Sequence, residues 1–518
     1  LGSALMAMHE YSTSREFFER ALEIDPEHVN SMVNLGALLG HLNDHRAAVN
    51  VYRQALALAP DIREAVLHLY TAMQELVDWD DRDIMFERVL NATRAQLEEG
   101  KVPTVNPYYS LLSPFGPEIM LKIALSHAQH AYDKVSSLLV DADLKRVPLP
   151  AGEGGKVNVA YMMADYRQHV TSHLIQTVFA RHDASKVSAF AIALNGDDGG
   201  SFRRRIRESV GGDRFLELYG QSDAEIASRI NQLSMHVLVD IDYNKERLTI
   251  MAFRPALLQV TWLAHPGTSG AKFVDYIVLD QVVAPPEHAQ FVAERIVYMK
   301  HHYQVNDHRV CYPYDEVDRR ALRRQEGLEE DALVVANFNG LYKIEPESFH
   351  IWRDGILRCK ERGRGGGRGG GGGASERTPC KVQLWLVSEG EESNENIRKE
   401  AGPLLSPLIV FAQRREFDAH IRRAAAADVF LDSFTYNAHT TAVDALWGGI
   451  AVVTLPGETI VSRVATGVLG GFGPGSETVT RTTGEYAELI GRLLEDRRML
   501  ERLRKRMMIG GRHGLESR

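Results

Sequence analysis

NAHTTAVDALWGGIAVVTLPGE, residues Asn437 to Glu458, is the stretch that decides the fold. It follows the short apolar run VFLDS (Val429 to Ser433), which predicts a buried strand. The turn NAH comes next, and Thr440 or Thr441 can cap a helix over TTAVDALWGG. Such a helix would aim its free N–H groups at an anion beside the carboxyl end of a parallel strand, where open α/β sheets bind nucleotides. The segment therefore predicts a sugar-nucleotide site, and the alternative is an ordinary capped crossover helix.

A second segment places a lysine at the end of another strand. LVVANFNGLYKI (Leu333 to Ile344) is an apolar run that enters a turn of small residues and ends in Tyr342-Lys343. A fixed ammonium beside a helix N-terminus would offset the charge of a departing diphosphate without a metal. The alternative is a solvated loop lysine.

Strands alternate with helices from about Ala151 to the end of the chain, which predicts parallel, doubly wound sheets. We expect a first lobe over 151–325 and a second lobe over 326–518. The first-lobe strands are predicted at NVAYMMA, SAFAIALN, MHVLVDI, LLQVTWLA and DYIVLD. The second-lobe strands are predicted at LVVANFN, KVQLWLVS, LIVFA, VFLDS and AVVTLP.

The first 77 residues repeat with a period of 34. Leu1-Gly2 recurs as Leu35-Gly36, Ala21-Leu22 as Ala55-Leu56, and Pro26 as Pro60. This period is typical of tetratricopeptide repeats, which are stacked antiparallel helix pairs; an unrelated helical hairpin pair is the alternative. We expect two repeats over 1–77, the first incomplete, with further repeats before residue 1, and a helical linker over 78–150.

Several motifs carry a family resemblance. They are DYRQHVTSH (Asp165 to His173), RPALLQVTWLAHPGTSGAKFVDYIVLDQ (Arg254 to Gln281), the helical segment from Trp79 to Leu112, and the two segments quoted first. Together they resemble the O-linked N-acetylglucosamine transferases, the family that also includes the plant SPINDLY-type protein fucosyltransferases. The resemblance implies a tetratricopeptide (TPR) α-solenoid followed by a GT-B fold with two Rossmann-like lobes, α + α/β overall. The short connection over 307–331 implies that the long domain of the animal enzymes between the lobes is absent.

The resemblance implies a role for each donor-side residue. Lys343 would neutralise the leaving diphosphate, while Thr440 and Thr441 would hold its β-phosphate. His439 would contact the donor sugar or phosphate, and Asp444 would accept the ribose hydroxyls. The implied reaction is an inverting transfer of N-acetylglucosamine from UDP-N-acetylglucosamine to Ser or Thr hydroxyls of proteins.

The remaining site residues are assigned in the same way. His420 and Arg423 would lie near the base, and His169 would face the acceptor. The sugar pocket would be lined by Leu263, Pro266 and Gly267. The general base is left open between His169, Asp240 and a phosphate oxygen of the donor.

We expect no cofactor and no metal. The segments expected to form the donor lobe hold no carboxylate pair of D-x-D type at a strand end. The densest ligand-like cluster fits no common zinc spacing; it consists of His301, His302, Asp307 and His308.

Five departures from the family pattern bear on activity. Gly340 stands where many members have Gln, Phe417 where a Lys near the base is usual, and Ala264 in place of a Gly. IDYNKERLT, after Asp240, lacks a family glycine turn, and MMIGGRHGLESR at the end lacks the family's closing helix. Two alternatives therefore stay open: protein O-fucosyl transfer from GDP-fucose, and a TPR scaffold whose catalytic half has decayed.

Composition limits the partners. The net charge of -9 argues against general nucleic-acid binding. No run of about 18 apolar residues predicts a membrane span. The three cysteines, Cys311, Cys359 and Cys380, predict no disulfide frame, and we expect a nuclear and cytoplasmic protein. A flexible glycine-rich insertion is predicted over 361–378. Expected partners are a UDP-sugar, protein acceptors bound through the TPR superhelix, and a second copy through upstream repeats.

Overall fold

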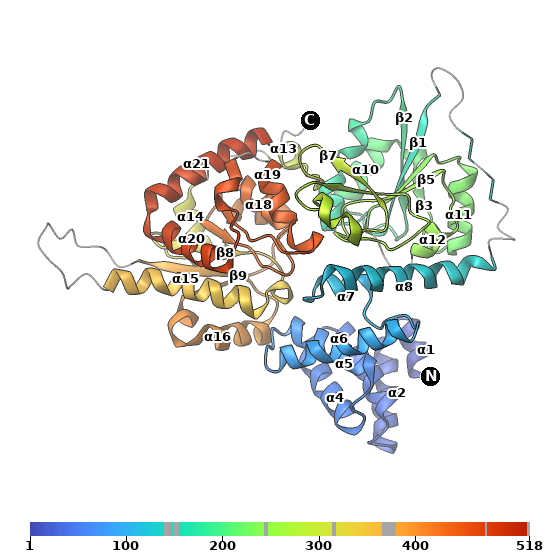
Figure 1. Cartoon of the computed structure of the whole chain (residues 1–518), viewed down its shortest axis with the longest axis horizontal. Helices are drawn as coiled ribbons and strands as arrows, with labels where there is room; N and C mark the ends of the chain where they lie inside the picture. Colours follow the sequence, from blue (N-terminus) through green and yellow to red (C-terminus); the bar gives the residue numbers. More distant parts are fainter. Residues whose placement is uncertain are drawn as a thin grey trace, which may run out of the picture.

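The structure is a computed structural model that describes residues 1–138, 144–145, 147–148, 155–242, 247–312, 317–364, 380–471 and 474–514. Three parts follow one another along the chain (Figure 1): a helical array, a first lobe and a second lobe. The two lobes stand side by side, and the array packs below them. Among the helices of the described residues, none is long and apolar enough to cross a lipid bilayer.

The array consists of antiparallel helices with a repeating contact. A Cβ on Gly2 would come within 2.7 Å of the Phe18 ring, and one on Gly36 within 2.6 Å of the Tyr52 ring. Glycine at both positions lets the paired helices approach closely, which explains the period of 34. The helices are α1 (Gly2–Ala7), α2 (Tyr11–Ile24), α3 (Val29–His41), α4 (His45–Leu58), α5 (Arg63–Glu75) and α6 (Arg82–Glu98).

Two further helices join the array to the first lobe. Helix α7 (Pro107–Leu111) is capped by Asn106, and α8 (Pro117–Ser136) begins with a proline in its first turn, a position that proline favours. The apolar face of α8 places Ala128, Ala131 and Val135 in the core of the first lobe. The predicted linker therefore forms part of the floor under this lobe (Figure 1).

The first lobe is a seven-stranded parallel sheet in the order β3-β2-β1-β4-β5-β6-β7. The order reverses between β1 and β4, which is where doubly wound sheets open a crevice. The strands are β1 (Val157–Met163), β2 (Val187–Ala193), β3 (Phe215–Glu217), β4 (Val237–Asp240), β5 (Leu258–Thr261), β6 (Tyr276–Asp280) and β7 (Arg295–Met299). The helices are α9 (Val170–Ile175), α10 (Ser201–Val210), α11 (Asp223–Gln232) and α12 (Leu248–Ala252).

The second lobe is a five-stranded parallel sheet in the order β10-β9-β8-β11-β12, with its reversal between β8 and β11. The strands are β8 (Leu333–Asn337), β9 (Val382–Val387), β10 (Ile409–Ala412), β11 (Val429–Leu431) and β12 (Ala451–Val453). The helices are α15 (Pro346–Arg364), α16 (Glu391–Leu405), α17 (Phe417–Ala424), α18 (Thr440–Trp447), α19 (Val464–Gly471), α20 (Thr483–Glu495) and α21 (Arg497–Gly514).

The connection between the lobes holds α13 (His308–Cys311) and α14 (Arg319–Gln325). The side chains of α14 bond to the second lobe: Arg319 donates to the carbonyls of Ala425 and Ala427, and Arg323 to that of Ala426. The predicted lobe boundary at 325 is therefore too late, because these contacts attach α14 to the second lobe.

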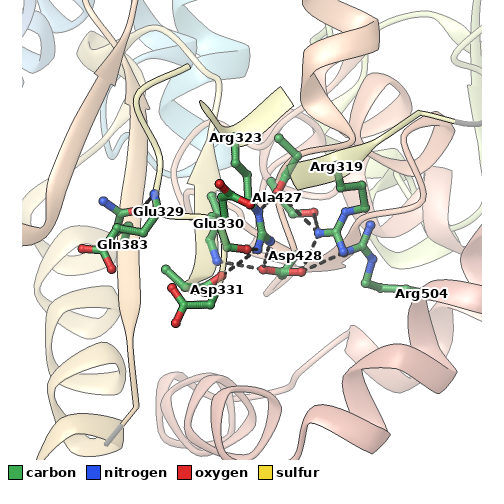
Figure 2. A network of polar contacts seen from close by, with 12 residues as sticks. Arg319, Arg323, Glu329, Glu330, Asp331, Gln383, Ala427, Asp428 and Arg504 are labelled. Atoms are coloured by element: carbon green, nitrogen blue, oxygen red, sulfur yellow. Dashed lines mark hydrogen bonds and ion pairs between the residues drawn. The ribbon is translucent and has the colours of Figure 1, made fainter. Parts of the chain in front are cut away.

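A buried charge cluster holds the second lobe together at the end away from its ligand edge (Figure 2). Asp428, directly before β11, accepts bonds from Arg319 (2.6 Å), Arg323 (2.7 Å) and Arg504 of α21 (2.7 Å). It also accepts a bond from the backbone N–H of Val334 at 2.8 Å. One carboxylate thus connects α14, α21 and the two central strands.

The lobes meet closely along α19. A Cβ on Gly467 would lie 2.8 Å from Val283 of the first lobe, and one on Gly471 would lie 2.4 Å from the His302 ring. Arg463, just before α19, donates to the backbone carbonyl of Val282 at 2.9 Å. These two glycines, one helical turn apart, let the second lobe rest directly on the first.

Two strands and one covalent bond differ from the sequence predictions. The ten predicted strands are all present, but β3 and β7 were missed, since β3 has three residues and β7 is an exposed edge strand.

The prediction of no disulfide is wrong. Cys359 and Cys380 are joined, because the end of α15 and the residues before β9 bring their Cα atoms to 6.0 Å. The cysteines therefore do not support the expected nuclear and cytoplasmic location, which stays a prediction.

Two sequence predictions concern segments only partly described. The glycine-rich insertion predicted over 361–378 begins within α15, which runs to Arg364, and its remainder lies outside the described residues. At the chain end α21 continues to Gly514; this is an extension of that one helix, and the lack of the family's closing helix stays a prediction.

Candidate active site

A cavity of about 1070 Å³ lies between the lobes, at the carboxyl ends of both sheets. Its size exceeds the roughly 300–1,000 Å³ of common ligand pockets, which leaves room for a nucleotide, a sugar and an acceptor side chain. Nine of the twelve predicted site residues line it: His169, Leu263, Lys343, His420, Arg423, His439, Thr440, Thr441 and Asp444.

The N-terminus of α18 opens into this cavity. Thr440 and Thr441 are its first two residues, whereas the sequence predicted one of them as the cap; His439 occupies that position, and no side chain caps the helix. The leading N–H groups therefore have no intrahelical acceptor. The Thr441 hydroxyl bonds to Asn339 Oδ1 at 2.5 Å, which ties the helix start to the loop after β8. This end of the cavity suits a phosphate.

Lys343 lies beside that helix start, in the 3-10 turn η4 (Leu341–Lys343) that follows β8. Its ammonium sits 4.1 Å from the centroid of the Tyr436 ring, which holds it by a cation–π contact. Burial lowers the pKa of Lys343 to about 8, although the charge of Glu389 opposes that change. The side chain is therefore a cation at neutral pH.

His439 is neutral next to this cation. Burial, and then the charge of Lys343, lower the pKa of His439 to about 3. Its ring stacks on Tyr436 with centroids 4.8 Å apart, and Nε2 lies 3.2 Å from the Val461 carbonyl oxygen. A neutral imidazole at this position can make a hydrogen bond to a sugar or phosphate without adding charge.

Aromatic rings form a slot at another part of the wall. His420 of α17 packs edge-on against Phe338, with centroids 5.2 Å apart, and Phe417 also lines the cavity. Burial lowers the pKa of His420 below its usual value. The guanidinium of Arg423 bonds to the Gln413 carbonyl at 2.6 Å and pairs with Glu326 at 3.4 Å, so its charge is already neutralised. The slot suits a flat heterocycle such as a nucleobase.

Asp444 contacts a partner that the sequence did not predict. Its Oδ1 lies 2.6 Å from Nε2 of His308, in the connection between the lobes. Burial alone would raise the pKa of Asp444, but the bond and charge of His308, aided by His173 and His420, hold it below its ordinary value. The role of Asp444 at a ribose stays a prediction.

The first lobe supplies the opposite wall. His169 caps α9, accepting a bond from the Thr171 N–H at 3.3 Å, and its ring is exposed to the cavity. Leu263 has a φ of 84°, a left-handed conformation that is rare for a branched side chain. Backbone strain of this kind collects at ligand sites, where the surrounding structure holds it.

Three predicted residues lie outside the cavity wall. Asp240 is the last residue of β4 and is 1% exposed, so its carboxyl lies below the surface of the cavity. Burial and the nearby Asp242 raise its pKa above the ordinary range. Pro266 and Gly267 are buried behind His265, which takes the wall position expected for them. None of the three lines the cavity of the described structure, and their predicted roles, Asp240 as a base and Pro266 and Gly267 at the sugar, stay predictions.

Sequence reasoning missed several wall residues. Asp242 lies two positions beyond Asp240, past the end of β4; it accepts a bond from the Ala164 N–H at 2.7 Å and lies 3.6 Å from Arg247. The strand-end position was a usable signal, because ligands bind beyond the carboxyl ends of parallel strands. The other missed residues are His265, Gln304, Asn339, Glu389 and Tyr436.

The structure accommodates two of the departures from the family pattern. A Cβ on Gly340 would lie 2.5 Å from the Tyr342 ring, so a Gln there would require Tyr342 to move. Phe417, in place of a Lys, stacks on His173 of the first lobe, with centroids 4.9 Å apart and planes 16° apart. At this position the chain therefore has an aromatic contact between the lobes, where the family pattern has a lysine charge near the expected base site.

Comparisons with known proteins agree with this geometry. Residues 76–322 and 375–513 match the family model described as glycosyl transferase family 41. The chain belongs to glycosyltransferase family 41. Residues 1–61 of this family 41 protein match a tetratricopeptide repeat model, in accord with the helix pairs of the array.

Two relatives and one solved structure are similar to this family 41 chain. The probable UDP-N-acetylglucosamine–peptide N-acetylglucosaminyltransferase SEC of Arabidopsis thaliana is 31% identical over 448 residues, 85% of this chain and 44% of its own length. The UDP-N-acetylglucosamine–peptide N-acetylglucosaminyltransferase of Caenorhabditis elegans is 28% identical over 554 residues, 84% of this chain and 46% of its own. The chain thus spans less than half the length of these relatives.

The structural comparison concerns the fold. A Thermobaculum terrenum O-GlcNAc transferase mutant superposes with a TM-score of 0.73 over 100% of this chain and 92% of that one, at 22% identity. The expected architecture, TPR helices followed by a two-lobed GT-B fold, is confirmed.

Proposed function

We propose that this chain is an inverting glycosyltransferase that moves N-acetylglucosamine from UDP-N-acetylglucosamine to Ser and Thr hydroxyls of proteins. The observation that carries the proposal is the meeting of Lys343 with the uncapped start of α18 at one end of a cavity whose wall also forms an aromatic slot. A cation and free N–H groups fit a diphosphate, and the slot fits its base. The names of the two relatives support the same donor.

The transfer proceeds by direct displacement at the anomeric carbon. The acceptor hydroxyl attacks from the side opposite UDP, the bond to the diphosphate oxygen breaks, and the hydroxyl proton passes to a base. Lys343 and the N–H groups of α18 stabilise the charge that develops on the diphosphate. This stabilisation needs no metal, so we propose metal-independent transfer.

Two groups on the first-lobe wall are placed to serve as the base. The His169 ring is exposed to the cavity, and Asp242 takes the place that the sequence gave to Asp240. Burial raises the pKa of Asp242 above its ordinary value, although Arg247 opposes this. A raised pKa makes a carboxylate a better proton acceptor for a hydroxyl.

Nucleotide binding tests the donor assignment. UDP at 100 times its dissociation constant should stabilise the protein by about 2.7 kcal/mol. We expect this increment in the wild type, measured by thermal unfolding with and without UDP, and its loss in Thr440→Ala/Thr441→Ala.

A matched threonine provides the control. Thr482 caps α20, outside the cavity wall, so Thr482→Ala should lower the stability of the free protein by about 1 kcal/mol and keep the UDP increment. A larger increment with GDP than with UDP would instead assign the chain to the fucosyl branch. No increment with either nucleotide would support the decayed scaffold.

A further inference from the structure

Three buried side chains of metal-ligand type meet beside the cavity. His173, His308 and Asp444 each offer one ligand atom, and these atoms all lie within 4.8 Å of one another. His173 and His308 are 0% exposed, and Asp444 is 3% exposed. The three residues come from α9 of the first lobe, α13 of the connection and α18 of the second lobe.

The hydrogen bonds around the cluster leave imidazole nitrogens available. His173 Nδ1 lies 2.7 Å from the Tyr312 hydroxyl oxygen, while its Nε2 is buried without a hydrogen-bond partner among the described residues. His308 Nε2 contacts Asp444 at 2.6 Å, and its Nδ1 likewise has no hydrogen-bond partner in the described part of the chain.

We propose that His173, His308 and Asp444 bind one Zn²⁺ ion. Two imidazoles and a carboxylate form a common zinc ligand set with a fourth position left for water. Mg²⁺ and Ca²⁺ prefer oxygen ligands, so two histidines disfavour them. The contact of His173 Nδ1 with Tyr312 resembles the outer hydrogen bond that orients a metal-bound histidine.

Binding requires small movements and the shift of one proton from Nε2 to Nδ1 of His308. Ligand atoms of a tetrahedral zinc lie roughly 3.4 Å apart, so the side chains must move together by about 1 Å. Zn²⁺ takes the place of the proton between His308 Nε2 and Asp444 Oδ1, and the neutral ring then carries that proton on Nδ1, which has no hydrogen-bond partner among the described residues. The bound ion joins the two lobes, because its ligands come from both of them and from their connection.

When Zn²⁺ is bound to Asp444, the carboxylate of that residue cannot make a hydrogen bond to a ligand in the cavity. This part rests on the proposed function and on the predicted contact of Asp444 with the ribose of the donor. Zn²⁺ therefore competes with UDP, which makes the cluster an inhibitory metal site.

Zinc titration of the untagged, chelator-treated full chain against a chromophoric chelator tests the site. We expect one Zn²⁺ per chain and a rise in melting temperature. His173→Ala and His308→Ala should each lose this binding. Tyr312→Phe should weaken it by about 10- to 100-fold, since it removes only the outer contact of His173.

The matched control is His301→Ala, an exposed histidine close to His308 in sequence. It should bind Zn²⁺ as the wild type does. Equal binding by His308→Ala and the wild type, or loss of binding in His301→Ala, would overturn the site. His308→Gln, which keeps a polar side chain of similar size, replaces any alanine variant that fails to fold.

UDP affinity measured with and without saturating Zn²⁺ separates the two parts of the proposal. We expect zinc to weaken UDP binding in the wild type and to leave it unchanged in His308→Gln. Zinc binding with an unchanged UDP affinity would retain the metal site and overturn the inhibition. Failure of UDP to bind even without zinc would count against the proposed function instead.

Discussion

Lys343 is a half-buried cation that makes no ion pair with any carboxylate in the described part of the chain. Its ammonium rests on the Tyr436 ring at 4.1 Å, and burial brings its pKa to about 8. Placing an ammonium in a half-buried site costs stability unless it gains a partner. A bound diphosphate would be that partner, which explains why the free protein holds the charge ready beside the start of α18.

The pKa of Lys343 predicts the alkaline limb of the pH profile. Below pH 8 the side chain is charged, about nine-tenths of it at pH 7, and above pH 8 it becomes neutral. We therefore expect kcat/KM, which reports the free enzyme, to fall as pH rises through about 8. Lys381→Ala should keep the same profile, because Lys381 is exposed and pairs with Asp331. A profile that stays level up to pH 9.5 would contradict the role of Lys343.

Single residues were predictable where a motif and a strand end coincided. Lys343 lies in the turn after β8, and His439, Thr440 and Thr441 lie at the start of α18. Their places at the end of a strand and the start of a helix can therefore be predicted from the neighbouring sequence alone. The partner of Asp444 was not predictable, because His308 lies 136 residues away and reaches it only when the lobes meet. Asp242 was missed because the direction of a side chain beyond a strand depends on the loop that follows.

At the scale of elements, the second lobe depends on one buried carboxylate. Asp428 receives three arginines from α14 and α21 (Figure 2). Burial alone would raise the pKa of Asp428, but the arginine charges outweigh burial and hold it below the ordinary range. The carboxylate therefore stays charged at neutral pH and balances cations that would otherwise be buried alone.

Removing this carboxylate should destabilise the protein strongly. We expect Asp428→Ala to lower the free energy of unfolding by about 3–5 kcal/mol, because it leaves buried arginine charges unpaired. Urea denaturation of the second-lobe transition measures the change. Asp331→Ala is the control: it removes an exposed pair with Lys381 and should have little effect. A loss for Asp428→Ala no larger than for Asp331→Ala would show that the arginines find other partners.

Elements were predicted well where the pattern was strong and local. Apolar runs predicted ten strands, and the 34-residue period predicted the helix pairs. That period reflects a repeated contact in which a glycine of one helix lies against an aromatic ring of the next, Gly2 against Phe18 and Gly36 against Tyr52. Strand β3 has too few residues to show a pattern, and β7 is exposed along most of its length. The Cys359–Cys380 bond depends on tertiary proximity, which cysteine spacing does not reveal.

At the scale of the molecule, the array contacts the second lobe mostly through its last part. Asn396 of α16 donates to the Leu76 carbonyl at 2.8 Å, Lys399 pairs with Asp80 at 2.7 Å, and Trp79 packs on Phe349 with centroids 5.5 Å apart. Before residue 61 the ion pairs with this lobe, among the described residues, are the exposed pairings of Arg46 with Glu392 and Glu395. The binding of protein acceptors by the early repeats stays a prediction.

Deleting residues 1–60 should therefore reduce the activity toward large protein acceptors. We expect kcat/KM for a long protein acceptor to fall by more than about tenfold, or about 1.4 kcal/mol, with little change for a short Ser-containing peptide. The deletion uncovers apolar surface of α5, so size-exclusion chromatography must show a soluble monodisperse protein. Arg46→Ala should leave both activities unchanged. Equal loss with protein and peptide would mean that the repeats support the lobes.

The central claim, that the cavity transfers a sugar from UDP with Lys343 neutralising the leaving group, is tested most directly by intact mass spectrometry. A serine-rich peptide is offered UDP-N-acetylglucosamine or GDP-fucose with the wild type or Lys343→Ala, and the melting temperature of each is measured in parallel. We predict one N-acetylglucosamine mass increment with the wild type and UDP-N-acetylglucosamine alone. Lys343→Ala should be slower by on the order of a hundredfold, about 3 kcal/mol, with little change in melting temperature. A fucose increment, no increment with either donor, or near-normal turnover in a folded Lys343→Ala would contradict the account.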